Sequence, residues 1–315
     1  MTLNGKFRIA EQHINYHGIC GKLFRPSDDC LRPGIIVLGG SGGGLGWSEG
    51  VAQKIAGEGY AALALAYFRY ADLPQSLANI PLEYFTKAFD WMSGQKEIDE
   101  RQLTLIGGSR GAELALVLAS IFPLVKAVVC YAPSSVIWGA CGGITSIGKP
   151  AWTYQGKPLW PLRIGFSLRA FYEHVKMGVC LVSRIPYRET PFFVAAFGDD
   201  SAVKEASISV ENIKGPILLI SGDDDQLSPS TLMSEMIMDR LREHEHPFPY
   251  KHLRYKGAGH AINLPDLPRE AYPTKITHPL THIVYDLGGD PDINAEAGKQ
   301  AWNEVLTFLK ENVSC

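Results

Sequence analysis

Short apolar runs alternate along the chain with segments in which apolar residues recur every three or four positions. Residues 34–38 and 60–65 are apolar runs of strand length, and residues 47–57 between them have the spacing of a helix. The same patterns predict further strands at 103–106, 127–131, 217–221 and 251–255, helices at 81–94, 112–120, 230–243 and 295–312, and an antiparallel strand or hairpin within 7–24. Repeated strand–helix–strand order predicts a mostly parallel central sheet with helices on both faces.

Residues 137–210 interrupt this alternation. The segment separates the strands expected at 127–131 and 217–221, and it is rich in Trp, Tyr, Pro and Arg. We expect it to form a cap insertion over the strand ends, so that residues 1–315 make up a single domain.

The composition narrows the class of protein. The chain has 315 residues, 46% of them hydrophobic and 20% charged, with a formal net charge of −3, which is typical of a globular protein and argues against nucleic acid as the main partner. Its longest nearly uninterrupted apolar stretch, residues 60–68, is too short to span a bilayer. The six cysteines lack C-x-x-C spacing and no secretory signal is visible, so we expect reduced thiols, no metal site, no cofactor and a cytoplasmic location. A homo-oligomer is compatible with these features.

The clearest chemical signal is the sequence Gly-Gly-Ser-Arg-Gly at residues 107–111, a G-x-S-x-G motif between a predicted strand and a predicted helix. A serine on such a sharp turn needs small neighbours two residues away on each side, because the strand and the helix nearly touch there. The turn lifts the hydroxyl above the sheet and directs the first N–H groups of the helix toward the same space. We therefore predict Ser109 as a nucleophile.

A serine hydroxyl is a weak nucleophile at neutral pH, so a base and an orienting carboxylate must accompany it. His260 follows the strand expected at 251–255, in a Gly-Ala-Gly-His loop that is placed to reach over the turn. Asp225 ends a run of three aspartates after the strand at 217–221 and is the preferred acid, with Asp224 as the runner-up. A weaker rival pair lies within the cap, Asp199 and Asp200.

A glycine-rich loop, residues 39–44, follows the first core strand. Its spacing fits neither G-x-G-x-x-G nor the Gly-Lys-Ser/Thr signature of a phosphate-binding loop. A flexible loop without bulky side chains suits an oxyanion hole, in which N–H groups stabilise the negative charge of a tetrahedral intermediate. We predict the N–H of Arg110 as one donor and that of Ser41 or Gly42 as the other, with glycines that serve only a tight turn as the alternative.

These motifs resemble those of a known family. Residues 107–114, Gly-Gly-Ser-Arg-Gly-Ala-Glu-Leu, are similar to the elbow of the acyl-CoA thioesterases related to bile acid-CoA:amino acid N-acyltransferase, in which G-x-S-K-G-G-E-L is typical. Residues 33–45, 64–74 and 82–85 and the loop that ends at His260 resemble further segments of that family. The resemblance extends from roughly the twentieth residue to the C-terminus, and it implies the α/β-hydrolase fold.

The resemblance also implies an activity, the hydrolysis of acyl-CoA thioesters through Ser109, His260 and Asp225 without a cofactor. The amino-acid-conjugating transferases of the family use cysteine as the nucleophile, so a serine favours hydrolysis. The animal members carry a β-sandwich domain before the hydrolase domain, and this sequence has no room for one. The acid loop of the family usually reads G-x-D-D-H-x-W, whereas Gln226 and Ser228 stand here, so the choice of acid stays open.

Three other functions remain as alternatives. A carboxylesterase or a dienelactone-hydrolase-like lactonase would use the same triad on an oxygen ester, because fold and triad do not fix the leaving group. An acyl-CoA N-acyltransferase would pass the acyl group to an amine. A non-enzymatic binding protein is least favoured, because the elbow and the histidine loop are intact.

The expected cap is strongly basic. Residues 149–188 contain seven basic residues and a single acidic one, Glu173, so this stretch carries +6. Aromatic residues are interleaved with the cations: Trp152, Tyr154, Trp160, Phe166, Phe171 and Tyr172. We expect Arg163 and Arg169 to attract the phosphates of coenzyme A and Trp160 to line the substrate pocket. The alternatives are a solvated helix face over core aromatics and a surface that touches an anionic membrane.

Overall fold

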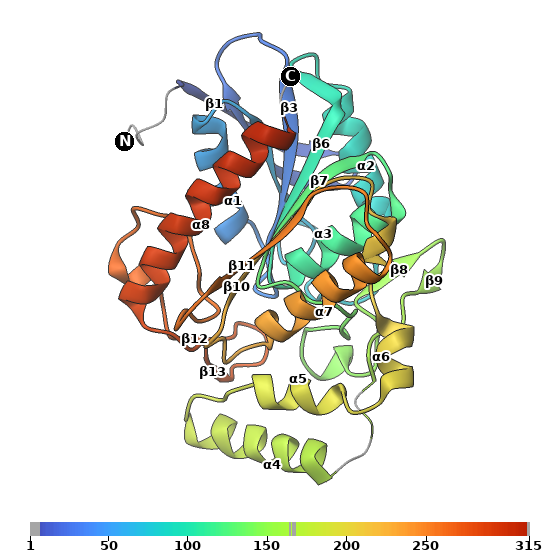
Figure 1. The fold of residues 1–315 in the computed structure, drawn as a ribbon, viewed down its shortest axis with the longest axis vertical. Coiled ribbons are helices and arrows are strands. Elements are labelled where there is room, and N and C mark those ends of the chain that lie inside the picture. The colour runs from blue at the N-terminus through green and yellow to red at the C-terminus, as the bar shows by residue number, and fades with distance from the viewer. Residues whose placement is uncertain (1–6, 164, 166–167, 314–315) are drawn as a thin grey trace.

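The computed structural model describes residues 7–163, 165 and 168–313. Its centre is an eight-stranded sheet in the order β1-β2-β4-β3-β6-β7-β10-β11 (Figure 1). The last six strands of this order are parallel to one another. Strands β1 and β2 form an antiparallel hairpin at the edge, and β2 is also antiparallel to β4. The strands span Ile9–Tyr16 (β1), Ile19–Pro26 (β2), Arg32–Leu38 (β3), Ala61–Ala66 (β4), Ile98–Gly108 (β6), Val125–Tyr131 (β7), Ile217–Gly222 (β10) and Tyr250–Tyr255 (β11).

Helices cover both faces of this sheet. Successive side chains of a strand point to opposite sides, and in the central strands the side chains on both sides are apolar. On β3, Ile36 and Leu38 belong to one buried cluster, and Ile35 and Val37 belong to another. The first cluster includes apolar residues of α2, α3 and α7, and the second includes those of α1 and α8. These helices span Gly46–Gly57 (α1), Glu83–Ser93 (α2), Arg110–Ile121 (α3), Ser230–Glu243 (α7) and Pro291–Asn312 (α8). The expected parallel sheet with helices on both faces is confirmed.

Several elements differ from the expectation at their ends. Strand β6 begins at Ile98, ahead of the apolar run that predicts it, because its first residues pair with β3 before a register shift. Helix α8 begins at Pro291 and not near residue 295, since the Asp290 side chain accepts a hydrogen bond from the N–H of Asp292 and caps the helix. The hairpin of β12 (Lys275–Thr277) and β13 (Val284–Asp286) is absent from the expectation, because strands of three residues show too little alternation.

The region between β7 and β10 lies at one end of the molecule, below the sheet in Figure 1. It contains the helices α4 (Leu168–Ser183), α5 (Thr190–Ala196) and α6 (Asp200–Ala206). Two short strands of this region, β8 (Trp152–Tyr154) and β9 (Lys157–Pro158), join β5 (Ile80–Pro81) in a small sheet. Neither α4 nor any other helix in the described part of the chain is long and apolar enough to cross a bilayer. Single turns of 3-10 helix lie at Ile144–Ser146, Val210–Asn212 and Arg269–Ala271.

The aromatic residues of this region do not share one environment. Trp152 is fully buried in the main core, with its ring centroid 6.4 Å from that of Phe85, so it does not line a cap pocket. Trp160 is 49% exposed. Phe166 lies outside the described residues. Trp152, which the small sheet carries into the core, therefore fits the alternative of core aromatics.

Candidate active site

The sequence-predicted site residues follow strands that end at the same edge of the sheet. Ser109 comes directly after β6, Asp225 comes shortly after β10, and His260 lies beyond the end of β11. Because these strands are parallel, their carboxyl ends share one edge. Only β7 lies between β6 and β10, and at about 4.8 Å per strand the two loops start about 10 Å apart. A histidine side chain between them is able to bridge that gap.

Ser109 occupies a strained turn. Its φ of 54° and ψ of −119° lie outside the regions that residues other than glycine commonly adopt. The Ser109 N–H donates to the carbonyl oxygen of Tyr131 at 2.8 Å, and the Ser109 carbonyl oxygen accepts from the N–H of Ala112 at 2.8 Å. A Cβ at Gly107 would overlap the carbonyl oxygen of Gly111, so the turn leaves no room for a side chain there. Strain of this kind persists where the surroundings enforce it, and it is frequent at catalytic groups.

The three consecutive aspartates after β10 have separate partners. The Asp223 carboxylate accepts from the N–H of Gly257 at 2.6 Å. The Asp224 carboxylate accepts from the N–H of Gly289 at 2.8 Å. Both therefore bind backbone N–H groups, Asp223 that of the histidine loop itself, and of the three only Asp225 contacts the His260 side chain.

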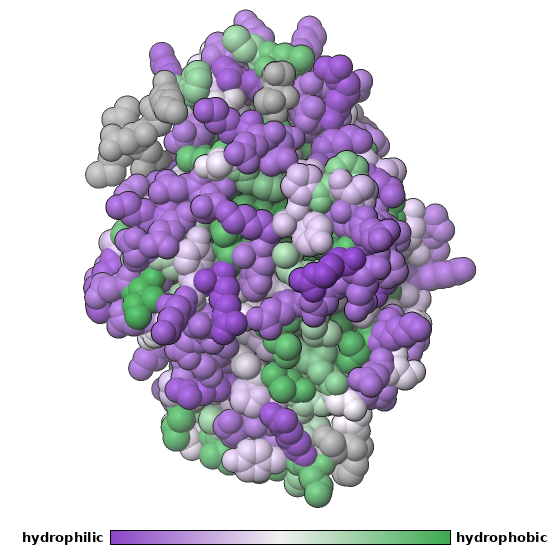
Figure 2. Space-filling model, in the orientation of Figure 1, coloured by the Kyte–Doolittle hydropathy of each residue, from purple (hydrophilic) through white to green (hydrophobic). Residues whose placement is uncertain are grey.

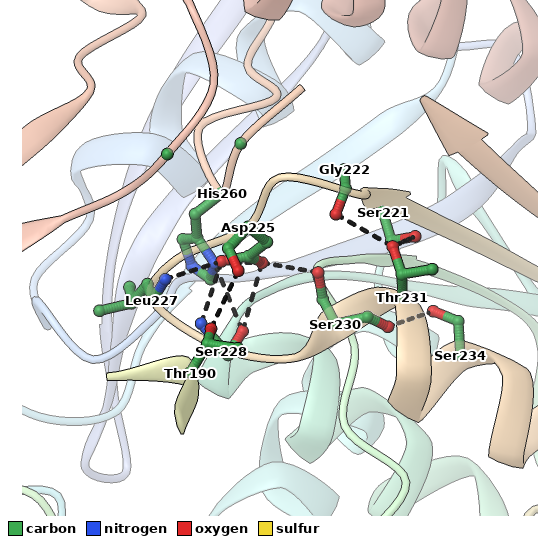
Figure 3. A network of polar contacts seen from close by, with 12 residues as sticks. Thr190, Ser221, Gly222, Asp225, Leu227, Ser228, Ser230, Thr231, Ser234 and His260 are labelled. Atoms are coloured by element: carbon green, nitrogen blue, oxygen red, sulfur yellow. Dashed lines mark hydrogen bonds and ion pairs between the residues drawn. The ribbon is translucent and has the colours of Figure 1, made fainter. Parts of the chain in front are cut away.

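Asp225 and His260 are in direct contact (Figure 3). The Asp225 Oδ2 atom lies 2.9 Å from His260 Nδ1, and the side chains are 2% and 12% exposed. The N–H groups of Leu227 and Ser228 donate to Asp225 Oδ1 at 3.0 Å each, and the Ser230 hydroxyl donates to Oδ2 at 2.6 Å. These donors hold the carboxylate in one orientation, so the proton of His260 sits on Nδ1 and the lone pair of Nε2 is free to accept a proton.

Ser109 and His260 are not hydrogen-bonded to each other in this structure. Within the described residues, no hydrogen bond joins the Ser109 hydroxyl to the imidazole. The structure thus brings Asp225 and His260 together and places Ser109 on the same edge of the sheet. In enzymes without bound substrate such catalytic hydrogen bonds are often long.

The glycine-rich loop after β3 passes beside the serine. A Cβ at Gly40 would lie 3.2 Å from Ser109 Cβ, so the loop approaches the turn as closely as a glycine allows. Ser41 and Gly42 follow directly in this loop. Arg110 is the first residue of α3, and the helix offers its N–H no carbonyl acceptor one turn earlier. The glycine-rich loop and the start of α3 therefore both lie next to Ser109.

The side chain of Arg110 forms an ion pair and hydrogen bonds within the protein. Its Nη1 atom pairs with Glu113 Oε2 at 2.8 Å, and Nη2 donates to the carbonyl oxygen of Trp138 at 3.0 Å. Glu113 also accepts from Trp152 Nε1 at 2.8 Å, and burial raises the pKa of this carboxyl. The pair ties the start of α3 to the region that follows β7, and the Arg110 Nε atom is buried without a hydrogen-bond partner among the described residues.

His278 is a site residue that the sequence patterns miss. Its Nδ1 atom accepts from the N–H groups of Leu280 and Thr281 at 3.3 and 3.4 Å. Burial lowers the pKa of His278, which keeps the ring neutral with its proton on Nε2. That Nε2 atom lies 3.3 Å from Ser41 Oγ in the glycine-rich loop. No pattern reveals this contact, because the unpredicted β12–β13 hairpin brings it about.

Glu189 is a second residue that the patterns miss. The N–H groups of Glu189 and Thr190 donate to the carbonyl oxygen of Gln226 at 2.9 and 3.1 Å, so the start of α5 is attached to the acid loop. Burial raises the pKa of Glu189 to about 8, and the Tyr285 hydroxyl lies 3.5 Å from its carboxyl group. A carboxyl group that is largely protonated at neutral pH therefore lies next to the candidate site.

The remaining candidates have other contacts or are exposed. Asp199 caps α6 by accepting from the N–H of Ala202 at 3.1 Å, and Asp200 is exposed. Arg163 and Arg169 are exposed, and the Arg163 guanidinium lies 5.3 Å from the ring centroid of Trp160. Within the described residues, no group of three His, Cys, Asp or Glu side chains is arranged to hold a metal ion.

Comparisons with known proteins identify the family of the chain. The family model described as BAAT / Acyl-CoA thioester hydrolase C terminal matches residues 80–144 and 193–314. Acyl-coenzyme A amino acid N-acyltransferase 1 of Mus musculus is 31% identical over 307 residues, which are 97% of this chain and 66% of that protein. Acyl-coenzyme A thioesterase 1 of Mus musculus is 30% identical over 291 residues, 92% of this chain and 62% of that protein. The chain thus spans slightly less than two thirds of the length of these relatives.

Solved structures support the fold. Esterase rPPE has a TM-score of 0.58 and 16% identity, over 100% of this chain and 86% of that one. A dienelactone hydrolase-like promiscuous phosphotriesterase from metagenomic libraries has a TM-score of 0.56 and 16% identity, over 96% and 98% of the two chains. The expected α/β-hydrolase fold is confirmed. The family model covers more than half of the chain, and its two matched ranges contain Ser109, Asp225 and His260. The chain belongs to the BAAT / acyl-CoA thioester hydrolase C-terminal family.

Proposed function

We propose that this protein hydrolyses acyl-CoA thioesters, with Ser109, His260 and Asp225 as a catalytic triad. The observation that carries the proposal is the 2.9 Å contact between Asp225 and His260 at the sheet edge that also holds Ser109 on its strained turn. The names of the relatives support the substrate class, since they are acyl-coenzyme A thioesterases and acyl-coenzyme A amino acid N-acyltransferases.

The first half of the proposed reaction forms an acyl-serine. His260 Nε2 takes the proton of Ser109 Oγ, and the oxygen attacks the carbonyl carbon of the thioester. The N–H of Arg110 and that of Ser41 or Gly42 stabilise the oxyanion. The C–S bond then breaks, and the coenzyme A thiol leaves with the proton from His260. With a pKa of about 8.5, a thiol leaves more readily than an alcohol. Its departure therefore depends little on protonation by His260.

The second half releases the product. Water loses a proton to His260 Nε2 and attacks the acyl-serine, and the tetrahedral intermediate expels Ser109 Oγ, which regains its proton from the imidazole. Asp225 keeps the ring in the required tautomer and stabilises its positive charge in both halves. The hydrogen bonds from Leu227, Ser228 and Ser230 fix the orientation of the Asp225 carboxylate.

The alternatives differ in the leaving group or in the acceptor. With an oxygen ester or lactone, the leaving group is a poorer one that must be protonated. In an acyltransferase, an amine would replace water as the acceptor in the second half of the reaction. Ser109 favours water as the acceptor, because the resemblance implies cysteine in the conjugating transferases. A panel of acyl-CoA thioesters and matched oxygen esters, with and without glycine or taurine, separates these activities.

In that panel we expect coenzyme A release without an amine, no amide product, and slower turnover of oxygen esters, with all activity lost in Ser109→Ala. An amide as the main product would replace the proposal by an acyltransferase. Faster turnover of the oxygen esters would replace it by a carboxylesterase.

We further propose that residues 137–210 form a cap insertion in a single hydrolase domain. In it, Arg163 and Arg169 attract the phosphates of coenzyme A, and Trp160 contacts the substrate. Because salt screens charges over about 10 Å at 0.1 M, kcat/KM for an acyl-CoA should fall with salt more than for the same acyl group on phosphate-free pantetheine. Identical salt curves for both substrates would remove this role of the cap.

A further inference from the structure

Helix α4 exposes an apolar stripe. Of the 17 large apolar side chains that are exposed among the described residues, eight lie between positions 168 and 185. Their exposed fractions reach 86% at Leu168 and Val182. Six of them recur every three or four positions and so share one side of the helix, which we call the α4 stripe: Leu168, Phe171, Tyr172, Val175, Val179 and Val182.

The opposite side of α4 attaches the helix to the protein. Ala170, Glu173 and Cys180 are buried there, and at about 100° per residue they lie across from the stripe. The Glu173 carboxylate accepts from the Tyr187 hydroxyl at 3.2 Å and pairs with Lys176 at 3.5 Å. An ordinary surface helix turns its apolar side toward the core. Helix α4 instead turns its apolar side to solvent, and the side that carries Glu173 contacts the protein.

The exposed charges around the α4 stripe are positive. Arg169 in the first turn and Arg184 just after the last turn are exposed, and Arg163 lies shortly before the helix and is exposed as well. Glu173 is the only acidic residue within 149–188, and it is buried and paired. Asp286, outside this stretch, offsets the charge of Arg188 at 2.9 Å. Arg163, Arg169 and Arg184, which flank the stripe, have no exposed acidic residue within 149–188 beside them.

We propose that α4 docks on a phospholipid surface that contains anionic lipids. A helix with an apolar side and flanking cations lies in the plane of the bilayer interface, with the apolar side about 5–10 Å deep. Anionic headgroups attract the cations. A second copy of this chain would instead bring two stretches of +6 together, and their repulsion disfavours that occupant of the stripe.

The position of α4 in the molecule suits this partner. Helix α4 is the outermost element at its end of the molecule, so a flat surface reaches it without meeting the central sheet (Figure 1). Hydrophobic and hydrophilic surface lie side by side at this end (Figure 2). A planar bilayer interface is therefore sterically able to contact the stripe.

Docking does not rest on the proposed function, but α4 is linked to the candidate active site through α5. The His174 ring on α4 lies 5.1 Å from the Phe192 ring on α5, centroid to centroid. The Thr190 hydroxyl at the start of α5 donates to the carbonyl oxygen of Asp225 at 2.9 Å. Helix α5 thus connects the docked helix to the acid loop.

The test is flotation of the full chain with vesicles of phosphatidylcholine, with and without phosphatidylserine. We expect flotation with the anionic vesicles only, and its loss as salt screens the cations. The double variant Val175→Glu/Val179→Glu should bind at least about tenfold more weakly, because charge cannot enter the apolar layer. Its melting temperature should be unchanged, because both side chains are at least half exposed.

A matched control adds the same charge elsewhere. Ile276→Glu/Ile293→Glu replaces two apolar side chains that are 47% and 43% exposed, outside α4, and should float like the unaltered protein. Equal loss in both double variants, equal flotation with neutral vesicles, or no flotation at all would overturn the proposal. Sedimentation that shows a dimer dissociated by Val175→Glu/Val179→Glu, with no vesicle binding, would assign the stripe to a second copy and overturn it too.

Discussion

Single residues decide which carboxylate serves the histidine. Asp223 and Asp224 are held by the N–H groups of Gly257 and Gly289, whereas Asp225 contacts His260. The three adjacent aspartates thus have separate partners, and the proposed triad acid is the one that contacts the imidazole.

Asp225→Asn should lower kcat by about a thousandfold or more, because the amide stabilises the wrong imidazole tautomer. Asp224→Asn is the matched control. It should leave kcat within about tenfold and act mainly on the melting temperature, since Asp224 contacts the N–H of Gly289. Steady-state kinetics and thermal melts of both variants make the comparison, and equal losses of kcat would remove Asp225 from the triad.

His278 acts through Ser41. The neutral ring donates from Nε2 to Ser41 Oγ and so holds the loop that we propose supplies an oxyanion donor. His278→Ala should therefore lower kcat by about tenfold, a fraction of the loss for a whole oxyanion donor, with little change in KM. His278→Gln, which restores a donor amide, should recover part of the rate.

His282→Ala is the control for this prediction, because His282 is exposed in the same segment. Its kcat should match that of the unaltered protein. A loss in His278→Ala that Gln does not relieve, or an equal loss in His282→Ala, would mean that the segment matters only for folding.

Close backbone packing between the end of β6 and the start of α3 determines the shape of the turn at Ser109. A Cβ at Gly107 would overlap the carbonyl oxygen of Gly111, and a Cβ at Gly111 would overlap that of Leu38. Gly107→Ala should therefore destabilise the fold by about 3 kcal/mol or more, since backbone must move to relieve the overlap. Gly178→Ala on α4 meets nothing within 4 Å and should be neutral or slightly stabilising. Urea unfolding of both variants tests this, and similar midpoints would refute it.

Elements with long apolar runs follow from the sequence, and short or contact-dependent ones do not. Helix α7 lies at the predicted residues, and α1, β10 and β11 lie within a residue or so of their predicted ends. The β12–β13 hairpin is too short to leave a pattern, and it carries His278 to Ser41. For the same reason the sequence suggests Ser109 and His260 by their loops but leaves Asp225 and Asp224 unresolved, because only the contacts of the folded loops separate the two.

At the scale of the whole molecule, the junction between α5 and the acid loop makes stability depend on pH. Burial raises the pKa of Glu189 to about 8, and the groups on which its charge acts, Tyr187, Tyr285 and Cys141, are neutral at pH 7. Between the ordinary carboxyl pKa and about 8, the folded state binds more protons than the unfolded state. The free energy of unfolding therefore falls as the pH rises through this window.

Glu189→Gln should remove this contribution. The variant should gain stability relative to the unaltered protein as the pH rises from about 5 to about 8. Glu205→Gln, at an exposed position on α6, provides the control and should leave the pH dependence as it is. Urea unfolding at several pH values measures the difference, and parallel curves for all three proteins would contradict the raised pKa of Glu189.

The central claim is an acyl-serine on the elbow, and one measurement tests it most directly. The protein is mixed with a long-chain acyl-CoA, quenched in acid within the first turnover, digested, and analysed by mass spectrometry. The account predicts an added acyl mass on the peptide that contains Ser109, coenzyme A release in step with it, and neither in Ser109→Ala. An acyl group on another residue, such as Cys141, or undiminished thioester turnover by Ser109→Ala, would contradict it.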